Sequence, residues 1–325
     1  MKRSNKFVLI VMFLLSFVYS CNGTNNQKIV SETTAPVTEK KTQIATTKVV
    51  TTFLPVYLFT KAVVKDIADI EILVKPGTDV HEYQGTPDNV KAIATANVLV
   101  KNGLGLEEFL ENTIKNSENA KLLTIDASKG IKPINAISPV DNISKGDDEH
   151  DHNHNHKNGN PHVWLDPVLA KQQVLNIRDG LIVADPQNKS KYESNAAAYI
   201  QKLDNLNNQF QETLKKTPNC TFITFHDAFP YLAKRYNLKQ VAVITIPERQ
   251  LSPTDIQKVI KTVKKYQVNA LFSEPGINNK LLESIAKDLK LTVHTLDSLE
   301  NGETNPDYYF KVMQKNLKTL ADNCQ

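Results

Sequence analysis

The chain has 325 residues, of which 40% are hydrophobic and 23% are charged, which is enough for one large domain or two lobes of ordinary size. The formal net charge is +4 at pH 7, and the lysines lie beside acidic residues along helical patterns rather than in one basic cluster. This distribution argues against a nucleic-acid-binding protein.

Residues 1–20 have the pattern of a signal peptide. Three basic residues precede an apolar run, Phe7–Val18, which is too short for a comfortable transmembrane helix. The run ends in the string Val18-Tyr19-Ser20-Cys21, and a small residue followed by cysteine is typical of a bacterial lipobox, in which Cys21 carries the lipid. Simple cleavage is the alternative, because Tyr19 is bulkier than the usual residue at its position. We expect no membrane-spanning segment in the mature protein.

Residues 21–48 are rich in Thr, Asn, Lys and Ser and hold few large apolar side chains. Such a segment buries too little surface to offset the entropy lost on ordering. We therefore expect a flexible tether, with the folded part beginning near Val49.

Short apolar runs and helical patterns alternate over residues 49–185. We expect strands at Val49–Leu54, Ile70–Val74, Val98–Val100 and Leu122–Ile125, and helices at Tyr57–Asp66, Thr86–Ala94 and Leu106–Asn116. Strands that alternate with helices of this length predict βαβ units and a parallel sheet covered on both faces. The sequence therefore predicts an N-terminal α/β lobe.

Residues 141–160 interrupt this order with a polar segment that has no apolar residue after Ile143, which predicts a disordered loop. Four of the eight histidines lie in it: His150, His152, His154 and His156. Imidazole binds zinc, copper and nickel, so we expect the loop to collect metal as an auxiliary site. A merely solvated loop and a purification tag are the alternatives, although tags are contiguous and sit at a terminus.

A long helical pattern follows over residues 186–217, with Pro186 at its start and Pro218 after its end. Apolar side chains recur on one face at steps of three and four. At about 1.5 Å per residue this helix runs on the order of 45 Å, so we expect a stiff connection between two lobes.

The remaining residues, 218–325, repeat the first plan. We expect strands at Thr221–Phe225, Val241–Thr245, Ala270–Ser273 and Leu291–Thr295, and helices at Asp227–Tyr236, Pro253–Tyr266, Lys280–Leu289 and Pro306–Ala321. This pattern predicts a second α/β lobe. Cys220 and Cys324 are the two cysteines besides Cys21, and in an oxidising compartment they form a disulfide or remain two separate thiols.

Three further histidines stand at the junctions between predicted strands and helices. His81 follows the second predicted strand, His226 directly follows the first strand of the C-terminal half, and His162 precedes a helix. Because parallel α/β sheets bind ligands beyond the carboxyl ends of their strands, we expect these histidines to face a shared crevice. Asp297 lies just past the last predicted strand. Three imidazoles and one carboxylate predict a four-coordinate zinc site.

Each of these residues also has an ordinary structural role open to it. A histidine near a strand end often only forms hydrogen bonds within the fold, and Asp297 could instead cap the turn that follows it. Glu82 and Glu274 are candidates for orienting the ligands or replacing one, with surface or capping roles as the alternative. Asp166, followed by proline, suits a helix cap better than a metal ligand, and His294 inside the last strand is expected not to bind metal.

The segments around these histidines resemble the metal-binding solute receptors of zinc and manganese ABC importers. The matching segments are Pro76–Tyr83, Asn160–Pro167, Thr224–Phe229, Phe272–Pro275 and Thr295–Leu299. The most specific string is Asn160-Pro161-His162-Val163-Trp164-Leu165-Asp166-Pro167. The resemblance implies two α/β lobes, each with a mainly parallel sheet flanked by helices, bridged by one long helix. It implies the metal ligands His81, His162, His226 and Asp297.

The resemblance also bears on the choice of metal. Manganese receptors of this family place a carboxylate at the third ligand position, where this chain has His226, and exchange of oxygen for imidazole favours Zn²⁺ over Mn²⁺. An acidic, His-rich loop is typical of the zinc members. We therefore expect Zn²⁺ as the transported ligand. Because a ligating imidazole must be deprotonated, we expect the affinity to fall below about pH 6.5.

The resemblance implies a receptor that captures extracytoplasmic Zn²⁺ and delivers it to an ABC permease and its ATPase, and that is not an enzyme. We expect a monomer that is anchored by the N-terminal lipid in the periplasm or on the extracellular face of the cytoplasmic membrane. One alternative is a zinc hydrolase with Glu82 as base, although the chain has no His-Glu-x-x-His string and a fourth protein ligand would close the site. A Mn²⁺ receptor and a surface metal-binding adhesin or chaperone without an importer are the others.

Overall fold

The structure is a computed structural model that describes residues 47–135, 159–244, 253–266, 268, 270–275 and 280–323. The predicted signal peptide, lipidation at Cys21, most of the tether and the four histidines of the predicted loop fall outside these residues. Cys220 is among the described residues and is disulfide-bonded. Its predicted partner, Cys324, lies outside the described residues.

The N-terminal half forms a four-stranded parallel sheet in the order β2-β1-β3-β4. Its strands are β1 (Lys48–Thr51), β2 (Asp69–Ile72), β3 (Val98–Lys101) and β4 (Leu123–Asp126). Its helices are α1 (Leu54–Val64), α2 (Pro87–Ala94) and α3 (Leu110–Ser117). The central strands carry buried valines and leucine, as expected for a parallel sheet covered on both faces.

The C-terminal half repeats the plan with a second parallel sheet in the order β6-β5-β7-β8. Its strands are β5 (Thr221–His226), β6 (Lys239–Ile244), β7 (Ala270–Ser273) and β8 (Thr292–Thr295). Its helices are α6 (Pro230–Arg235), α7 (Pro253–Tyr266), α8 (Lys280–Leu289) and α9 (Tyr308–Asn323). The predicted fold of two α/β lobes is therefore confirmed.

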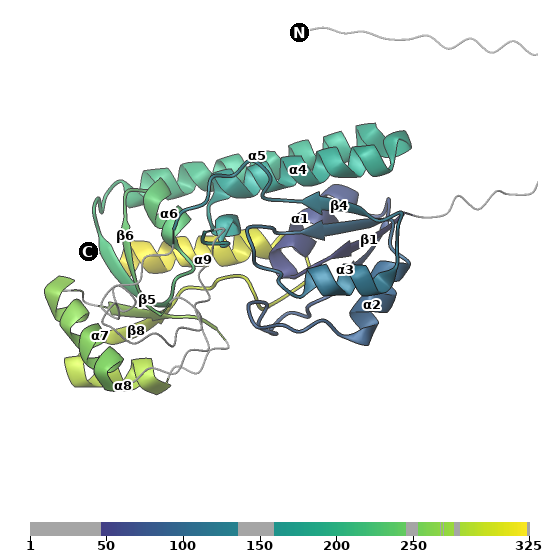
Figure 1. Cartoon of the computed structure of the whole chain (residues 1–325). Coiled ribbons are helices and arrows are strands. Elements are labelled where there is room, and N and C mark those ends of the chain that lie inside the picture. The colour runs from purple at the N-terminus through teal and green to yellow at the C-terminus, as the bar shows by residue number, and fades with distance from the viewer. Residues whose placement is uncertain are drawn as a thin grey trace, which may run out of the picture. The chain divides into compact units, whose positions relative to one another are not determined.

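Two long helices connect the sheets. Helix α4 (Pro167–Ala184) is followed by a short 3-10 helix, η3 (Pro186–Asn188), and then by the 26-residue α5 (Lys189–Leu214), and Figure 1 shows α4 and α5 side by side. Helix α5 also packs against α1 of the first half and α9 at the end of the second. Its buried side chains are Tyr192 and Ala196, followed by those of the predicted apolar face, Tyr199, Leu203, Leu206, Phe210 and Leu214.

Capping residues account for several helix starts. The hydroxyl of Thr86 accepts a hydrogen bond from the backbone N–H of Asn89, and the side-chain oxygen of Asn89 accepts one from the backbone N–H of Thr86, so that a capping box opens α2. Asp166 accepts a bond from the backbone N–H of Val168 and caps α4, with proline at the first helical position. Asp166 therefore has the capping role that its sequence context indicates.

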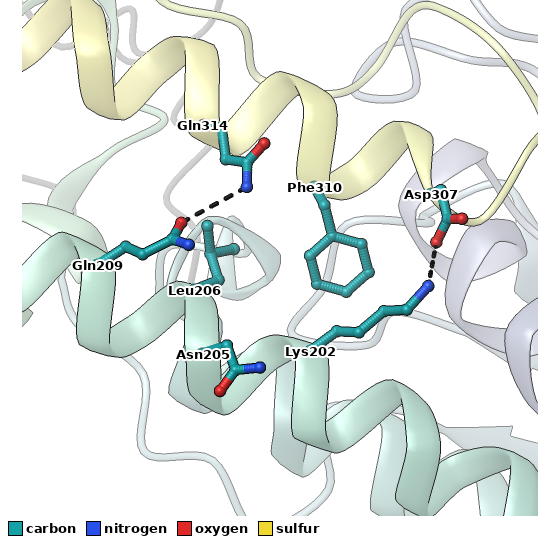
Figure 2. Close-up of a pocket in the computed structure, with 7 residues that line it drawn as sticks. All are labelled: Lys202, Asn205, Leu206, Gln209, Asp307, Phe310 and Gln314. Atoms are coloured by element: carbon teal, nitrogen blue, oxygen red, sulfur yellow. Dashed lines mark hydrogen bonds and ion pairs between the residues drawn. The ribbon is translucent and has the colours of Figure 1, made fainter.

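A surface pocket lies between α5 and α9 (Figure 2). Lys202 donates to Asp307 over 2.7 Å and lies 5.7 Å from the ring centre of Phe310. Across the pocket the side-chain amide of Gln314 donates to that of Gln209 over 3.5 Å. None of the lining residues belongs to a possible metal-ligand group within the described part of the chain.

Among the residues that the structure describes, no helix has the length and apolar character needed to cross a membrane.

Candidate metal centre

Three histidines from distant parts of the sequence converge on one point. His81 lies in the loop after β2, His162 immediately precedes the 3-10 helix η2 (Val163–Leu165), and His226 ends β5. Each offers a ring nitrogen within 4.8 Å of the others. The ring centres are 4.7 to 5.4 Å apart. The structure thus brings together the three predicted imidazoles.

A carboxylate joins the histidines, and it belongs to Glu300. Its Oε1 lies 3.8 Å from Nε2 of His162 and 4.0 Å from Nε2 of His81. Possible ligand atoms of Glu300, His226 and Glu274 also lie within 4.8 Å of one another. Its backbone carbonyl accepts a hydrogen bond of 3.2 Å from the N–H of Gly77, in the loop that carries His81.

Asp297, the carboxylate expected from sequence, is not in this cluster. Its Oδ1 accepts a hydrogen bond of 2.8 Å from the N–H of Leu299. Its backbone N–H donates to Oδ1 of Asn316, and its backbone carbonyl accepts from Nδ2 of the same asparagine. Asp297 therefore caps the turn after β8, which is the alternative role considered for it. That turn carries the chain onward to Glu300, three residues later.

Glu274 lies against His226. It follows β7, the strand next to β5, and its Oε1 is 3.1 Å from Nδ1 of the imidazole. A neutral ring that donates Nδ1–H to this carboxylate keeps the lone pair of Nε2 for a metal. Nε2 of His226 is fully buried and has no hydrogen-bond partner among the described residues, as expected of an atom that awaits a cation.

The carboxylates change the pKa values of the metal-free cluster. Burial lowers the pKa of His226, but the charge and hydrogen bond of Glu274, helped by Glu300 and Asp227, outweigh this and raise it to about 9. Burial raises the pKa of Glu300 to about 8, with His226 opposing and nearby carboxylates adding to the shift. Both shifts favour the protonated form of their group, and a bound metal would have to displace those protons.

Asp79 was missed by the sequence reasoning. It forms a second possible ligand group with His81 and Glu300, and its Oδ1 accepts a 2.7 Å hydrogen bond from the N–H of His81. Its only sequence signal is its place two residues before His81. Glu82 is exposed, and neither it nor His294 in β8 belongs to any ligand group within the part of the chain that the structure describes.

Three imidazoles and a carboxylate form a donor set that zinc accepts in four-coordinate geometry. Hard cations such as Mn²⁺ favour oxygen-rich sites, so the nitrogen-rich cluster favours Zn²⁺.

A family model described as "Zinc-uptake complex component A periplasmic" matches residues 49–323. The chain belongs to this zinc-uptake family. Members are substrate-binding receptors for zinc transport and not enzymes, so the predicted zinc-type receptor class is confirmed. The family's description makes the receptor one component of a larger uptake complex.

Individual relatives agree with the family. The high-affinity zinc uptake system protein ZnuA of Bacillus subtilis is 33% identical over 99% of this chain and 98% of its own length. The laminin-binding protein Lmb of Streptococcus agalactiae, described as bifunctional with adhesin and metal-transporting activity, has a TM-score of 0.74 at 30% identity. That match covers 86% of this chain and 100% of Lmb.

Zn(II)-bound AdcA from Streptococcus pneumoniae has a TM-score of 0.72 at 32% identity, over 86% of this chain. The chain spans only 58% of that longer protein.

Proposed function

We propose that this chain captures Zn²⁺ outside the cytoplasm through His81, His162, His226 and Glu300, and passes it to an ABC-type importer. The observation that carries this proposal is the convergence of three buried imidazoles and one carboxylate from four separate segments. Capture of zinc is the function of the family to which the chain belongs.

The geometry supports capture rather than catalysis. A catalytic zinc site leaves one position open for water and places a general base beside it. Here Glu300 is the proposed fourth ligand, and Glu82, the base of the hydrolase alternative, is exposed and absent from the ligand groups of the described residues. Zinc is therefore the cargo of this site.

The partners follow from the role. We infer that an ABC permease and its ATPase receive the zinc, and that lipid on Cys21 holds the receptor at the outer face of the cytoplasmic membrane or in the periplasm. The names of the relatives support this: AdcA of S. pneumoniae is called a zinc-binding lipoprotein, and ZnuA of B. subtilis an uptake-system protein.

The decisive experiment is zinc titration of the mature protein, by calorimetry with a competing chelator, for wild type, His226→Ala, Glu300→Gln and Asp297→Asn. We expect the first two variants to lose at least tenfold in affinity. Asp297→Asn is the matched control, because asparagine retains the oxygen that caps Leu299, and it should bind as wild type does. Wild-type affinity in Glu300→Gln with a loss in Asp297→Asn would reverse the assignment of the fourth ligand.

A further inference from the structure

The side chain of Asn160 contacts two of the three histidine-bearing segments of the site. Its Oδ1 lies 3.0 Å from the backbone N–H of His162 and 3.0 Å from Nδ1 of the same residue's ring. Its Nδ2 donates to the backbone carbonyl of Asp227 over 2.7 Å and to the carboxylate of Asp227 over 3.3 Å. Asp227 is the neighbour of His226, so one amide spans two of the metal ligands.

These partners leave the amide only one orientation. A backbone carbonyl accepts and a backbone N–H donates, so the nitrogen of Asn160 must face Asp227 and its oxygen must face His162. An amide oxygen only accepts, and therefore Nδ1 of His162 must carry the hydrogen. The remaining ring nitrogen, Nε2, then presents its lone pair toward His81, His226 and Glu300.

The backbone of Asn160 is held as firmly as its side chain. Its N–H donates to the carbonyl of Ile134 over 2.7 Å, and its carbonyl accepts a 2.6 Å bond from the hydroxyl of Tyr231 in α6. The N–H of Ile134 donates to the same hydroxyl over 3.0 Å. Asn160 is 2% exposed, so these bonds form away from competing water.

We propose that Asn160 is a positioning residue for zinc capture. It holds the His162 ring with Nε2 toward the metal, and it couples the place of that ring to the β5 end that carries His226. This inference rests on the proposed function, since it concerns how the same site is organised before metal arrives.

The test combines zinc affinity with the tautomer of His162. In metal-free protein, ¹⁵N-labelled on histidine and held at a pH where this ring is neutral, the ring nitrogen shifts report which nitrogen carries hydrogen. We expect the Nδ1–H form in wild type. Asn160→Leu removes both the acceptor and the donor, so we expect the Nε2–H form to become populated and zinc affinity to fall about 10–100-fold.

Asn160→Asp separates the two roles. Aspartate keeps an oxygen for the ring and backbone of His162, so the Nδ1–H form should persist and zinc affinity should exceed that of Asn160→Leu. It loses the donor to Asp227, and it serves as the second variant if the leucine substitution does not fold. Asn176→Leu is a matched control, because the hydrogen bonds of that asparagine go to Ala127, Lys129 and Gln172, which lie outside the ligand groups.

An unchanged tautomer and affinity within twofold of wild type in a folded Asn160→Leu protein would overturn the positioning role. Equal losses of zinc affinity in Asn160→Asp and Asn160→Leu, with the same tautomer of the His162 ring in both variants, would also overturn it. Failure of the proposed function is a separate result: it would show as absent zinc binding in wild type, or as unchanged binding in His226→Ala, whatever the Asn160 variants do.

Discussion

The carboxylate of Glu274 lies 3.1 Å from Nδ1 of His226, and the two residues stand at the ends of neighbouring parallel strands, β7 and β5. Parallel strands deliver their carboxyl ends to the same edge of the sheet, so the sheet itself sets this pair. Both side chains are buried, and the carboxylate both orients the ring and increases its basicity.

Removal of that carboxylate should weaken zinc binding although Glu274 is not among the four proposed ligands. We expect Glu274→Ala to lower the affinity about 10–100-fold, because the ring loses the acceptor at Nδ1 that fixes its orientation and its tautomer. Glu274→Gln, which keeps an acceptor for Nδ1–H, should lose less. Competition with a fluorescent zinc chelator measures both. The exposed Glu283 on α8 supplies the control substitution Glu283→Gln, and an equal loss there would contradict the role of Glu274.

Zinc binding at pH 7 should release protons from the site. His226, with a pKa raised to about 9, and Glu300, with a pKa raised to about 8, both hold protons in the metal-free protein below those values. Zinc requires the deprotonated ligands, so apparent affinity should rise with pH through neutrality and level off only near pH 9. The dependence therefore extends well above the pH of about 6.5 expected for an ordinary imidazole.

Calorimetry at pH 7 in two buffers of different ionisation enthalpy counts these protons. We expect between one and two per zinc, because the two groups share a charge interaction and titrate together. Identical binding enthalpies in both buffers would show that the metal-free site holds no exchangeable proton.

Metal preference should follow the identity of residue 226. His226→Asp replaces nitrogen by oxygen, so we expect zinc affinity to fall and the ratio of zinc to manganese affinity to shrink about tenfold or more. Competitive titration of Zn²⁺ against Mn²⁺ measures this ratio. His294→Asp, in the same lobe but outside the ligand groups of the described residues, should leave the ratio unchanged. An unchanged ratio of zinc to manganese affinity in His226→Asp would show that His226 does not determine the preference for zinc.

Trp164 should contribute to stability through one buried hydrogen bond. Its indole Nε1–H donates 2.7 Å to the carbonyl of Ser298, in the turn that leads to Glu300. Trp164→Phe leaves that carbonyl without its donor, and we expect a loss of about 1–3 kcal/mol in the free energy of unfolding. Urea denaturation of the metal-free protein measures it. A loss below about 0.5 kcal/mol would mean that another group satisfies the carbonyl.

The lobes, the long helix and the three histidines were predictable because they follow from periodicity and from the strand-end rule. The carboxylate that completes the cluster was not predictable, because Asp297 and Glu300 share one short turn. Which carboxylate reaches the histidines depends on the hydrogen bond from Leu299 to Asp297, and no periodic pattern encodes it. The role of Asn160 depends in the same way on a contact with Asp227, far along the chain, that residue spacing does not reveal.

The bond from Gly77 to Glu300 joins an early loop of the polypeptide to a late one. The chain must therefore be made through Glu300 before the four proposed donors exist together, and a product that is truncated before this residue holds at most a partial set.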